Sequence, residues 1–348
     1  MDTIVIGGGQ AGLAAGFYLS RMGRKFIILD AHGETGDAWR LRWDSLRLFT
    51  PAWLNGLPGM PFPGEPDHFP AKDEVVDYLR TYRKRFDLPV RHNCKVLRVT
   101  KGAQKFEVVT GEGSLFADNV IVATGGYQKP RIPTFAGEID PGVHQIHSLA
   151  YKNPEGLPLG GVLVVGAGIS GLQIALDVHS CRRTVYLAGS ATTHIPDFVF
   201  RYFERPFVWF ASNILTTRTP IGRKVCKAMK RTGKGAPLIN VSMKDIYQAG
   251  ILNVSRIVGA QDGWPVTGNG VSMPVSSIIW ATGYSPDYSW IDIPGCVDDR
   301  GYPATRRGVS TAVKGLYFVG STFQYGLTST WMAGVGRDAE FVCRAIGA

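Results

Sequence analysis

Two glycine-rich turns are the residues of this sequence with the clearest chemistry. Residues 7–12 (GGGQAG) follow the apolar run 3–6, and residues 166–171 (GAGISG) follow the apolar run 162–165. In such a turn the first glycine permits a tight bend, the second lets the backbone approach a pyrophosphate, and the third lets the next helix pack against the strand. The glycines in these roles are Gly7, Gly9 and Gly12, and then Gly166, Gly168 and Gly171. Because a helix N-terminus also attracts phosphates, the sequence predicts two dinucleotide sites.

One acidic residue distinguishes the two sites. Asp30 follows the second apolar run after the first turn, at a place where a carboxylate accepts hydrogen bonds from ribose hydroxyls. The matching place after the second turn holds Gly189 and Ser190 instead. An acid would repel a ribose 2′-phosphate, and Arg182, Arg183 or Arg201 could supply positive charge nearby, with Arg183 as the expected cofactor-binding residue. The pattern therefore favours FAD at the first site and NADPH at the second, with NADH as the open alternative.

Each glycine turn needs a strand before it and a helix after it, and the sequence provides both. Apolar residues fill 3–6 and 26–29 with a helical stretch between them, and the same order recurs from 162 to 187. Further strands are expected at 119–123, which runs into Thr124-Gly125, at 277–281, which runs into Thr282-Gly283, and at 315–319, which ends at Gly320. The sequence predicts an α/β fold with two doubly wound dinucleotide-binding domains.

We expect the second domain to be inserted in the first. The FAD-binding domain is predicted to cover residues 1–155 and 275–348, and the NAD(P)H-binding domain residues 156–274. A helical insertion is expected within the second domain at about 195–250, where the strand–helix pattern is interrupted.

The insertion has an unusual composition. Seven aromatic residues lie between 198 and 210, and basic residues follow at steps of three and four from Arg223 to Lys234, which predicts a helix with one basic face. We expect the aromatic residues to form a pocket wall or lid, with a place in the core as the alternative. The basic face is expected to be solvated, to touch a membrane surface or to steer phosphates.

Composition limits the remaining functions. The chain has 348 residues, a net charge of +10 and 43 glycines. Five scattered cysteines without a CxxC pair argue against a redox dithiol and a zinc site, so no metal is expected, and they are typical of a reducing cytoplasm. The glycine-rich N-terminus, with Asp2, is interpreted as a folded strand and turn rather than a signal peptide.

Several longer segments resemble the two-domain flavoproteins of the flavin-containing monooxygenase type. They are Gly36-Asp37-Ala38-Trp39, residues 43–51 (WDSLRLFTP), residues 123–133 (ATGGYQKPRIP), residues 279–287 (IWATGYSPD) and residues 334–340 (GVGRDAE). Together they are similar to the bacterial CzcO-type and plant YUCCA-type branches, and the resemblance covers nearly the whole chain.

The resemblance implies a reaction. NADPH would reduce FAD, oxygen would form a C4a-(hydro)peroxyflavin, and this would oxygenate a small, aromatic or lipophilic substrate. The expected cofactor-binding residues are Gly7, Gly9, Gln10, Ala11, Gly12, Asp30, Trp39, Trp43, Val96, Ala123, Thr124, Gly125, Gly320 and Gln324 for FAD, and Gly166, Gly168, Ser170, Gly171, Arg183, Ala281, Thr282 and Gly283 for NADPH. Thr50 and Gln324 are the expected catalytic residues.

Alternatives remain open at this level. Trp39 and Trp43 either line the flavin or fill the core, and Thr50 either contacts the flavin or bonds its own turn. The family's linker fingerprint is only partly present around His147 and Tyr151, so an NAD(P)H:flavin oxidoreductase without oxygen insertion, or an NAD(P)H-sensing flavoprotein, is the alternative function. The expected partners are a small molecule and O₂, without nucleic acid; a homo-oligomer and a membrane-surface contact stay open.

Overall fold

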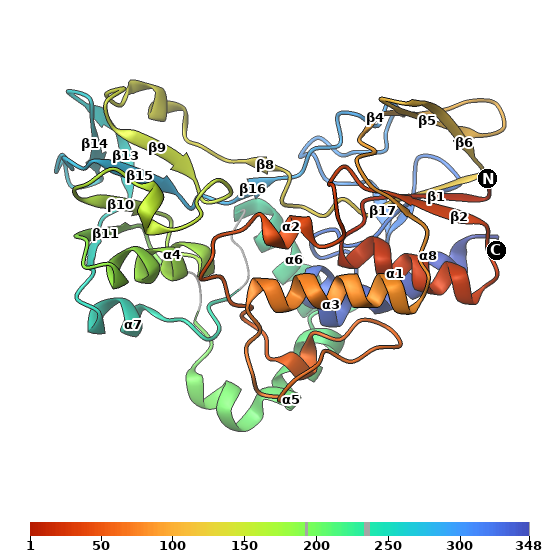
Figure 1. The fold of residues 1–348 in the computed structure, drawn as a ribbon, viewed down its shortest axis with the longest axis horizontal. Helices are drawn as coiled ribbons and strands as arrows, with labels where there is room; N and C mark the ends of the chain where they lie inside the picture. Colours follow the sequence, from red (N-terminus) through yellow and green to blue (C-terminus); the bar gives the residue numbers. More distant parts are fainter. Residues whose placement is uncertain (192–193, 233–236, 348) are drawn as a thin grey trace.

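The computed structural model describes residues 1–191, 194–232 and 237–347, and it forms two lobes that each contain a parallel β-sheet (Figure 1). Lys234, at the end of the predicted basic segment, lies outside the described residues. The two sheets confirm the predicted α/β fold with two doubly wound domains.

The first lobe is built on a seven-stranded sheet in the order β17-β18-β19-β7-β1-β2-β3. These strands are β1 (Thr3–Ile6), β2 (Phe26–Leu29), β3 (Val90–Arg91), β7 (Asn119–Val122), β17 (Thr305–Arg306), β18 (Val309–Ser310) and β19 (Leu316–Phe318). The pairs from β19 to β3 are parallel, and β17 and β18 extend the sheet as an antiparallel edge. Because β1 to β7 and β17 to β19 come from opposite ends of the chain, the second lobe is inserted between them.

Different layers cover the two faces of this sheet. Helices α1 (Gln10–Arg21), α3 (Lys72–Arg85) and α8 (Met332–Ala345) pack on one face, beside the short α2 (Asp37–Arg40), η1 (Ala52–Leu54) and η4 (Leu327–Thr330) (Figure 1). The antiparallel strands β4 (Val96–Lys101), β5 (Phe106–Thr110) and β6 (Gly113–Ala117) bury Phe106 and Val108 against the other face. The sheet is therefore apolar on both sides, as its uninterrupted runs of Val and Ile predict.

The second lobe contains a five-stranded sheet in the order β12-β11-β10-β15-β9. Its strands are β9 (His144–His147), β10 (Val162–Val165), β11 (Val185–Ala188), β12 (Leu252–Val254) and β15 (Ser277–Trp280), all parallel. The predicted limits 156–274 are therefore too narrow for this sheet, because β9 and β15 pair with each other outside them. We propose that the NAD(P)H-binding domain extends from β9 to β15.

This second sheet is also covered on both faces. Helices α4 (Ile169–Ser180) and α7 (Met243–Gln248) pack together on one side. The hairpin β13 (Ile257–Gln261) and β14 (Trp264–Thr267) and the turn η2 (Thr134–Glu138) cover the other, while η3 (Pro154–Gly156) precedes β10. Since α7 packs on α4, it belongs to the second domain itself, and the insertion consists of the helices before it.

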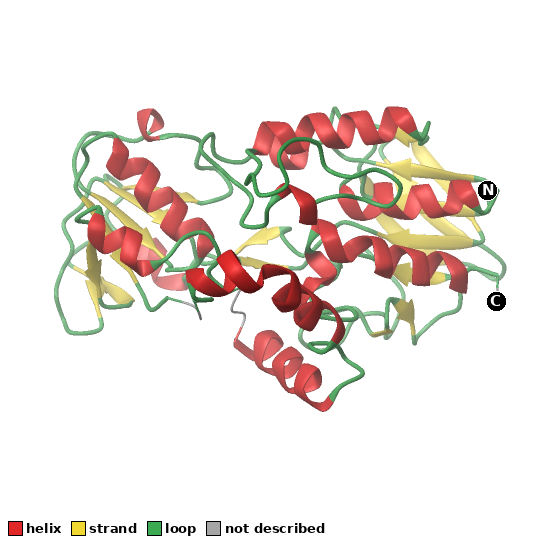
Figure 2. Ribbon diagram, turned by 90° about the horizontal axis from the view of Figure 1, so that it is seen from below, coloured by secondary structure: helices red, strands yellow, loops and turns green. Residues whose placement is uncertain are grey.

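Two helices form the insertion. They are α5 (Asp197–Asn213), which is kinked at Phe203 and contains Pro206, and α6 (Pro220–Thr232). In Figure 2, seen from below, α5 crosses in front of the rest of the molecule. In the described part of the chain, α5 contacts η4 of the first lobe.

The lobes are joined by two chain crossings that pair with each other. The short strands β8 (Lys129–Pro130) and β16 (Tyr284–Ser285) form an antiparallel ladder. Arg42 donates to the Tyr284 hydroxyl over 2.9 Å, and Lys129 forms an ion pair with Asp287 at 2.8 Å. The crossings are thus tied to each other and to the first lobe.

His147 lies buried beside this junction in its neutral form. Its Nε2 lies 3.0 Å from the Gly283 carbonyl oxygen, while its Nδ1 accepts a hydrogen bond from Leu149 N–H at 3.1 Å. Only a ring protonated on Nε2 alone satisfies both contacts. Burial, together with the charge of Arg42, lowers the pKa of His147, although the bond to Gly283 acts in the opposite direction.

None of the described helices is both long enough and apolar enough to span a bilayer.

The helix layer of the first lobe predicts a large cost for truncating Leu13, which is fully buried on α1. Leu13→Ala leaves a cavity, so we expect the free energy of unfolding to fall by about 2–5 kcal/mol. Leu159→Ala, at a position 94% exposed, is the matched control and is expected to change it by less than about 0.5 kcal/mol. Urea unfolding followed by circular dichroism measures both; equal losses would contradict the packing described.

The neutral state of His147 predicts a pH effect on stability. A lowered pKa means that the unfolded chain binds this proton more readily, so stability is lost as the pH falls below the ordinary value of 6.5. His147→Gln keeps a donor toward Gly283 but cannot titrate. We expect the free energy of unfolding of this variant to decline less between pH 7 and pH 5.5 than that of the wild type. His144→Gln on the same strand is the control, and an equal change in slope for both variants would contradict the assignment.

Candidate functional site

The first glycine turn is shaped by contacts that leave no room for side chains. A Cβ on Gly7, where φ is +108°, would lie 2.6 Å from the Ala123 carbonyl oxygen, and a Cβ on Gly12 would overlap the Gly7 carbonyl. A Cβ on Gly9 would meet none of the described residues within 4 Å. The outer glycines are therefore needed for packing, whereas the middle one leaves space for a ligand.

The second glycine turn repeats this geometry. A Cβ on Gly166, with φ at +115°, would overlap the Ala281 carbonyl, and a Cβ on Gly171 would overlap the Gly166 carbonyl. Gly168 again faces open space among the described residues. The two turns therefore present the same kind of surface at the carboxyl edges of the two sheets.

Both turns lead into helix N-termini that suit an anion. Gly9 and Gly168 are the N-caps of α1 and α4, and neither has a side chain to occupy the first N–H groups. The first turns carry only uncharged residues: Gln10, Ala11 and Gly12 in α1, and Ile169, Ser170 and Gly171 in α4. With the helix dipole, these N–H groups form two sites fit for pyrophosphate.

An Ala-Thr-Gly segment lies against each turn. Ala123 ends β7 beside Gly7, and Ala281 follows β15 beside Gly166, as the carbonyl contacts show. The Gln128 amide donates to the Thr124 hydroxyl at 2.5 Å and to the Gly125 carbonyl at 3.0 Å. The Thr282 hydroxyl donates to the Arg131 carbonyl. The structure thus brings Ala123 and Thr124 to the first turn and Ala281 and Thr282 to the second, and Gly125 and Gly283 follow them in the chain.

Asp30 lies directly under the first glycine turn. It is buried, and a Cβ on Gly8 would overlap one of its carboxylate oxygens. The other oxygen accepts a hydrogen bond from His32 N–H at 3.1 Å and contacts the His32 ring, a bond that raises the pKa of His32. Cys94 N–H bonds the Asp30 carbonyl, which brings the chain just before Val96 to the same edge. This arrangement is compatible with the ribose and adenine roles expected of Asp30 and Val96, which stay predictions.

The second site differs at the equivalent place. Gly189 has φ of +117°, and its Cβ would lie 3.7 Å from the Ala167 nitrogen of the glycine turn. The predicted role of Arg183 is wrong. Its guanidinium donates to the carbonyls of Pro154, Leu157, Pro158 and Gly160. Because Arg183 precedes β11, it lies at the opposite edge of the sheet and stabilises the loop before β10.

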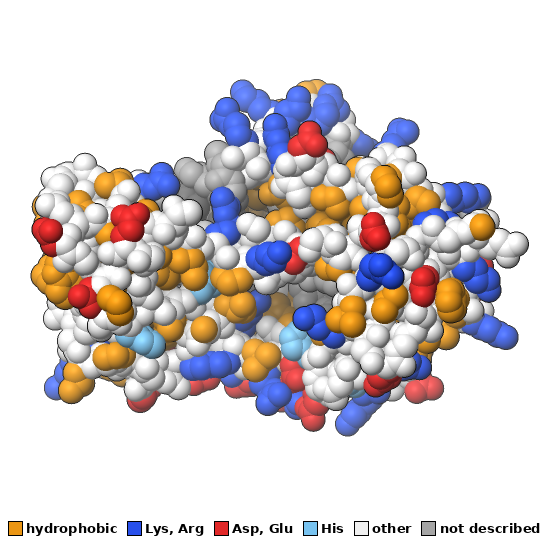
Figure 3. Space-filling view, turned by 90° about the horizontal axis from the view of Figure 1, so that it is seen from above, with side chains coloured by type: hydrophobic (Ala, Val, Ile, Leu, Met, Phe, Trp, Pro, Cys, Tyr) orange, Lys and Arg blue, Asp and Glu red, His pale blue; other side chains and the backbone are white. Residues whose placement is uncertain are grey.

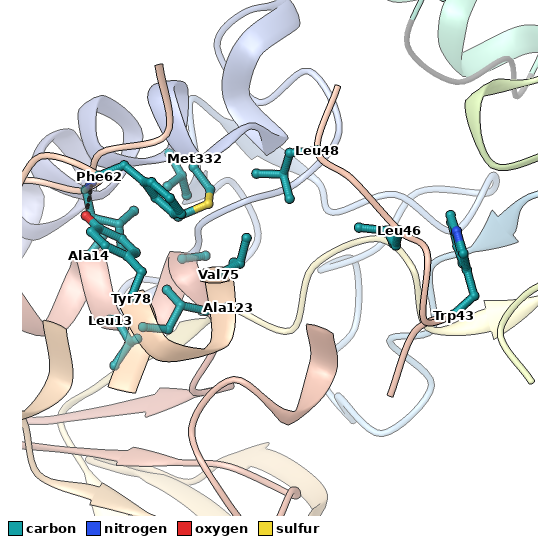
Figure 4. Close-up of a cluster of buried hydrophobic side chains, with 14 of the residues drawn as sticks. Leu13, Ala14, Trp43, Leu46, Leu48, Phe62, Val75, Tyr78, Ala123 and Met332 are labelled. Carbon is teal, nitrogen blue, oxygen red and sulfur yellow. Dashed lines mark hydrogen bonds between the residues drawn. The ribbon is translucent and has the colours of Figure 1, made fainter. Parts of the chain in front are cut away.

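The two tryptophans occupy different surroundings. The Trp39 indole N–H donates to Gln10 at 3.3 Å, so it lies beside the first turn of α1. Trp43 is buried, and among the described residues its indole N–H has no acceptor. Figure 4 shows Trp43 with Leu46, apart from the group around Leu13. The unused donor of Trp43 fits a contact with a bound cofactor.

Gly320 and Gln324 follow β19 but point in different directions. Gly320, with φ of +80°, approaches α1 so closely that its Cβ would lie 2.9 Å from the Ala11 Cβ. The Gln324 side chain is buried, with its nitrogen against Gly308 and its oxygen 3.4 Å from Ser321 N–H. Gly320 therefore lies beside the first turn of α1. Among the described residues the buried Gln324 nitrogen has no acceptor, and the expected role of Gln324 at the flavin stays a prediction.

Thr50 is held inside its own turn. Its hydroxyl donates to the Asn55 side-chain oxygen at 2.7 Å, and the Asn55 amide donates to the carbonyls of Thr50 and Pro51 at 2.9 Å. Both side chains are buried. The structure therefore gives Thr50 the turn-forming role that was left open, and Asn55, which the sequence analysis missed, is its partner.

The insertion covers this turn with apolar side chains. Phe207 and Val208 of α5 pack in one cluster with Phe49, Trp53, Leu54 and Trp331. The Phe49 and Trp331 rings meet edge to face at 5.4 Å, and the Trp53 indole donates to Glu204 of α5 at 3.0 Å. Burial raises the pKa of Glu204. Trp53, Trp331 and Glu204 were missed because nothing in their local sequence shows that α5 folds back onto them.

Comparisons with known proteins agree with this geometry. Residues 4–197 match the family described as pyridine nucleotide-disulphide oxidoreductase. An uncharacterised CzcO-like oxidoreductase from Geobacillus kaustophilus is 39% identical, over 99% of this chain and 98% of the relative. The indole-3-pyruvate monooxygenase YUCCA1 of Oryza sativa is 29% identical, over 94% of this chain and 88% of the relative.

A solved structure resembles the whole chain. The flavin-containing monooxygenase from Stenotrophomonas maltophilia superposes with a TM-score of 0.80 at 28% identity, over 99% of this chain and 97% of that one. The glycine turns, helix N-termini and Asp30 fit the FAD and NAD(P)H that such enzymes use. The chain therefore belongs to the pyridine nucleotide-disulphide oxidoreductase family and is a flavin-dependent oxidoreductase related to the CzcO-like and YUCCA flavin monooxygenases.

Proposed function

We propose that this protein is an FAD-dependent, NADPH-consuming monooxygenase of a small aromatic or lipophilic substrate. The observation that carries the proposal is the apolar cover that α5 forms over the turn 49–54 and Trp331 of the first lobe, the lobe that also carries the first glycine turn. When bound, FAD supplies the capacity to accept hydride from NADPH and to activate oxygen. The chain's own residues must bind the two cofactors, orient the substrate and shield the reaction site from water.

The glycine turns divide the binding between two cofactors. The free N–H groups at Gly9 and Gly168 would each hold a pyrophosphate, and Asp30 would accept hydrogen bonds from the ribose of FAD. Gly189 and Ser190 leave the second ribose without an acid, which favours NADPH over NADH. The two Ala-Thr-Gly segments, one beside each turn, would line the path between the cofactors.

The aromatic cluster would shield the reaction from water. Phe49, Trp331 and Phe207 form an apolar wall from three chain segments that are distant in sequence. Such a wall favours an apolar substrate and strengthens electrostatic interactions beside it by excluding solvent. This is the argument for an aromatic or lipophilic substrate class.

The open space at the two middle glycines predicts a selective loss of each cofactor. A methyl group at Gly9 or Gly168 meets no described residue, so the fold should tolerate Gly9→Ala and Gly168→Ala. Gly9→Ala should purify with less than about a tenth of the wild-type FAD, a loss of at least ~1.4 kcal/mol in binding. Gly168→Ala should keep its FAD and raise the NADPH concentration needed for half-maximal anaerobic flavin reduction by at least tenfold.

Each variant is the control for the other. Flavin absorbance measures the FAD content, circular dichroism measures folding, and the anaerobic reduction rate measures the response to NADPH. Gly12→Ala, where the added methyl overlaps the Gly7 carbonyl, should instead destabilise the fold. If Gly9→Ala lost only NADPH reduction, or Gly168→Ala lost only FAD, the assignment of the two sites would be reversed.

The monooxygenase assignment predicts a stoichiometry. With a panel of aryl ketones and sulfides, a true substrate should yield one oxygenated product per NADPH consumed, with one ¹⁸O atom from ¹⁸O₂ and little H₂O₂. Product is measured by mass spectrometry and H₂O₂ by a peroxidase assay. A reductase would give one H₂O₂ per NADPH with every compound, and rapid reduction by NADPH with transfer to a dye acceptor would then replace the oxygenase assignment.

A further inference from the structure

The outward face of α5 is a row of exposed aromatic side chains. Tyr202, Phe203, Trp209 and Phe210 are 71%, 56%, 61% and 41% exposed. Tyr202 and Trp209 are seven residues apart, and so are Phe203 and Phe210, so each pair is separated by about two helical turns. The four rings therefore share one side of α5, which is kinked at Phe203. Isolated exposed apolar residues are ordinary, but a contiguous aromatic row of this kind marks an interaction surface.

The inward faces of the insertion are already satisfied. Phe207 and Val208 of α5 pack on the cluster around Trp331, and Val225, Cys226 and Met229 of α6 pack with Phe323 and Leu327. The insertion is therefore anchored to the first lobe by one set of apolar residues. The exposed aromatic row of α5 is separate from these packed residues, so anchoring the insertion does not explain it.

The same insertion carries most of the net charge of the protein. Residues 197–232 contain eight Lys and Arg against two Asp and Glu, a net charge of +6 out of +10 for the chain. On α6 the exposed cations are Arg223, Lys224, Lys227 and Arg231, and Ile221 at the start of that helix is 58% exposed. In Figure 3, Lys and Arg side chains (blue) crowd the part of the molecule that protrudes at the top of the view.

We propose that the α5–α6 insertion docks this protein on an anionic lipid bilayer surface. Aromatic residues beside Lys and Arg are the composition of helices that lie in the membrane interface, where apolar rings enter the headgroup region and cations meet acidic lipids. The charge complementarity selects this partner. A second copy of the chain would bring the cations of two α6 helices toward one another in a symmetric interface, and like charges oppose that contact.

Docking here has a consequence for the substrate, which rests on the proposed function. The outward residues of α5 would face the lipid, while Phe207 and Val208 of the same helix cover the turn 49–54, where the proposed function puts the apolar substrate. A lipophilic substrate dissolved in the bilayer would therefore meet the protein at the helix that borders its reaction site.

Binding is tested with the flavin-loaded protein and vesicles of phosphatidylcholine alone or with 30% phosphatidylglycerol. Cosedimentation should be strong only with the anionic vesicles and should weaken in 0.5 M NaCl. Neutral vesicles binding equally well, or anionic vesicles binding no protein at low salt, would overturn the proposal. No turnover is needed, so this result is independent of the oxygenase assignment.

Two sets of variants separate the aromatic and ionic parts. The triple variant Lys224→Gln, Lys227→Gln and Arg231→Gln should lower the partition coefficient on the order of a hundredfold. The double variant Tyr202→Ser and Trp209→Ser should lower it by about tenfold. Unchanged flavin content and anaerobic reduction by NADPH verify that both variants fold.

Matched controls use equally exposed residues elsewhere. They are Phe116→Ser, at a site 53% exposed on β6, and the triple variant Lys25→Gln, Lys84→Gln and Lys314→Gln. Both should bind vesicles like the wild type. If the controls lost vesicle binding equally, net charge alone would explain the effect, and the proposal would be overturned. It would also be overturned if the protein were a dimer in sedimentation velocity and Trp209→Ser dissociated that dimer without changing vesicle binding. The aromatic row would then contact a second copy of the chain.

Discussion

The close approach of two backbone segments, once in each lobe, is the constraint on which the rest of the molecule depends. The turn at Gly7 meets the Ala123 carbonyl, and the turn at Gly166 meets the Ala281 carbonyl, at separations that exclude a side chain. These contacts bring the ends of β1 and β7 together in the first lobe and the ends of β10 and β15 together in the second. The first N–H groups of α1 and α4 then lie at the sheet edges without a capping side chain. The same steric rule thus produces the packing and the anion sites.

The insertion shows how one helix serves two environments. Phe207 and Val208 of α5 belong to the protein interior, whereas Tyr202 and Trp209 face outward. In the sequence, α5 lies between β11 and β12 of the second lobe, but in space it packs on η4 of the first lobe. The insertion therefore links the two lobes. The aromatic residues of α5 therefore include both buried and exposed positions.

Local sequence was enough to predict both glycine turns, the strands that flank them and the two-domain fold, since strand, turn and helix signals lie within about thirty residues. Features set by distant contacts could not be predicted. The limits of the second domain depend on the pairing of β9 with β15, more than a hundred residues apart. Arg183 was misassigned because its carbonyl partners are set by how the loop before β10 folds.

The paired crossings β8 and β16 restrict how the lobes move. A single linker would let one lobe twist freely about it, but two antiparallel segments held by a ladder and by Arg42 and Lys129 resist torsion. Bending across this short ladder would meet less resistance than torsion about it, so the connection favours one direction of relative displacement over free rotation of the lobes.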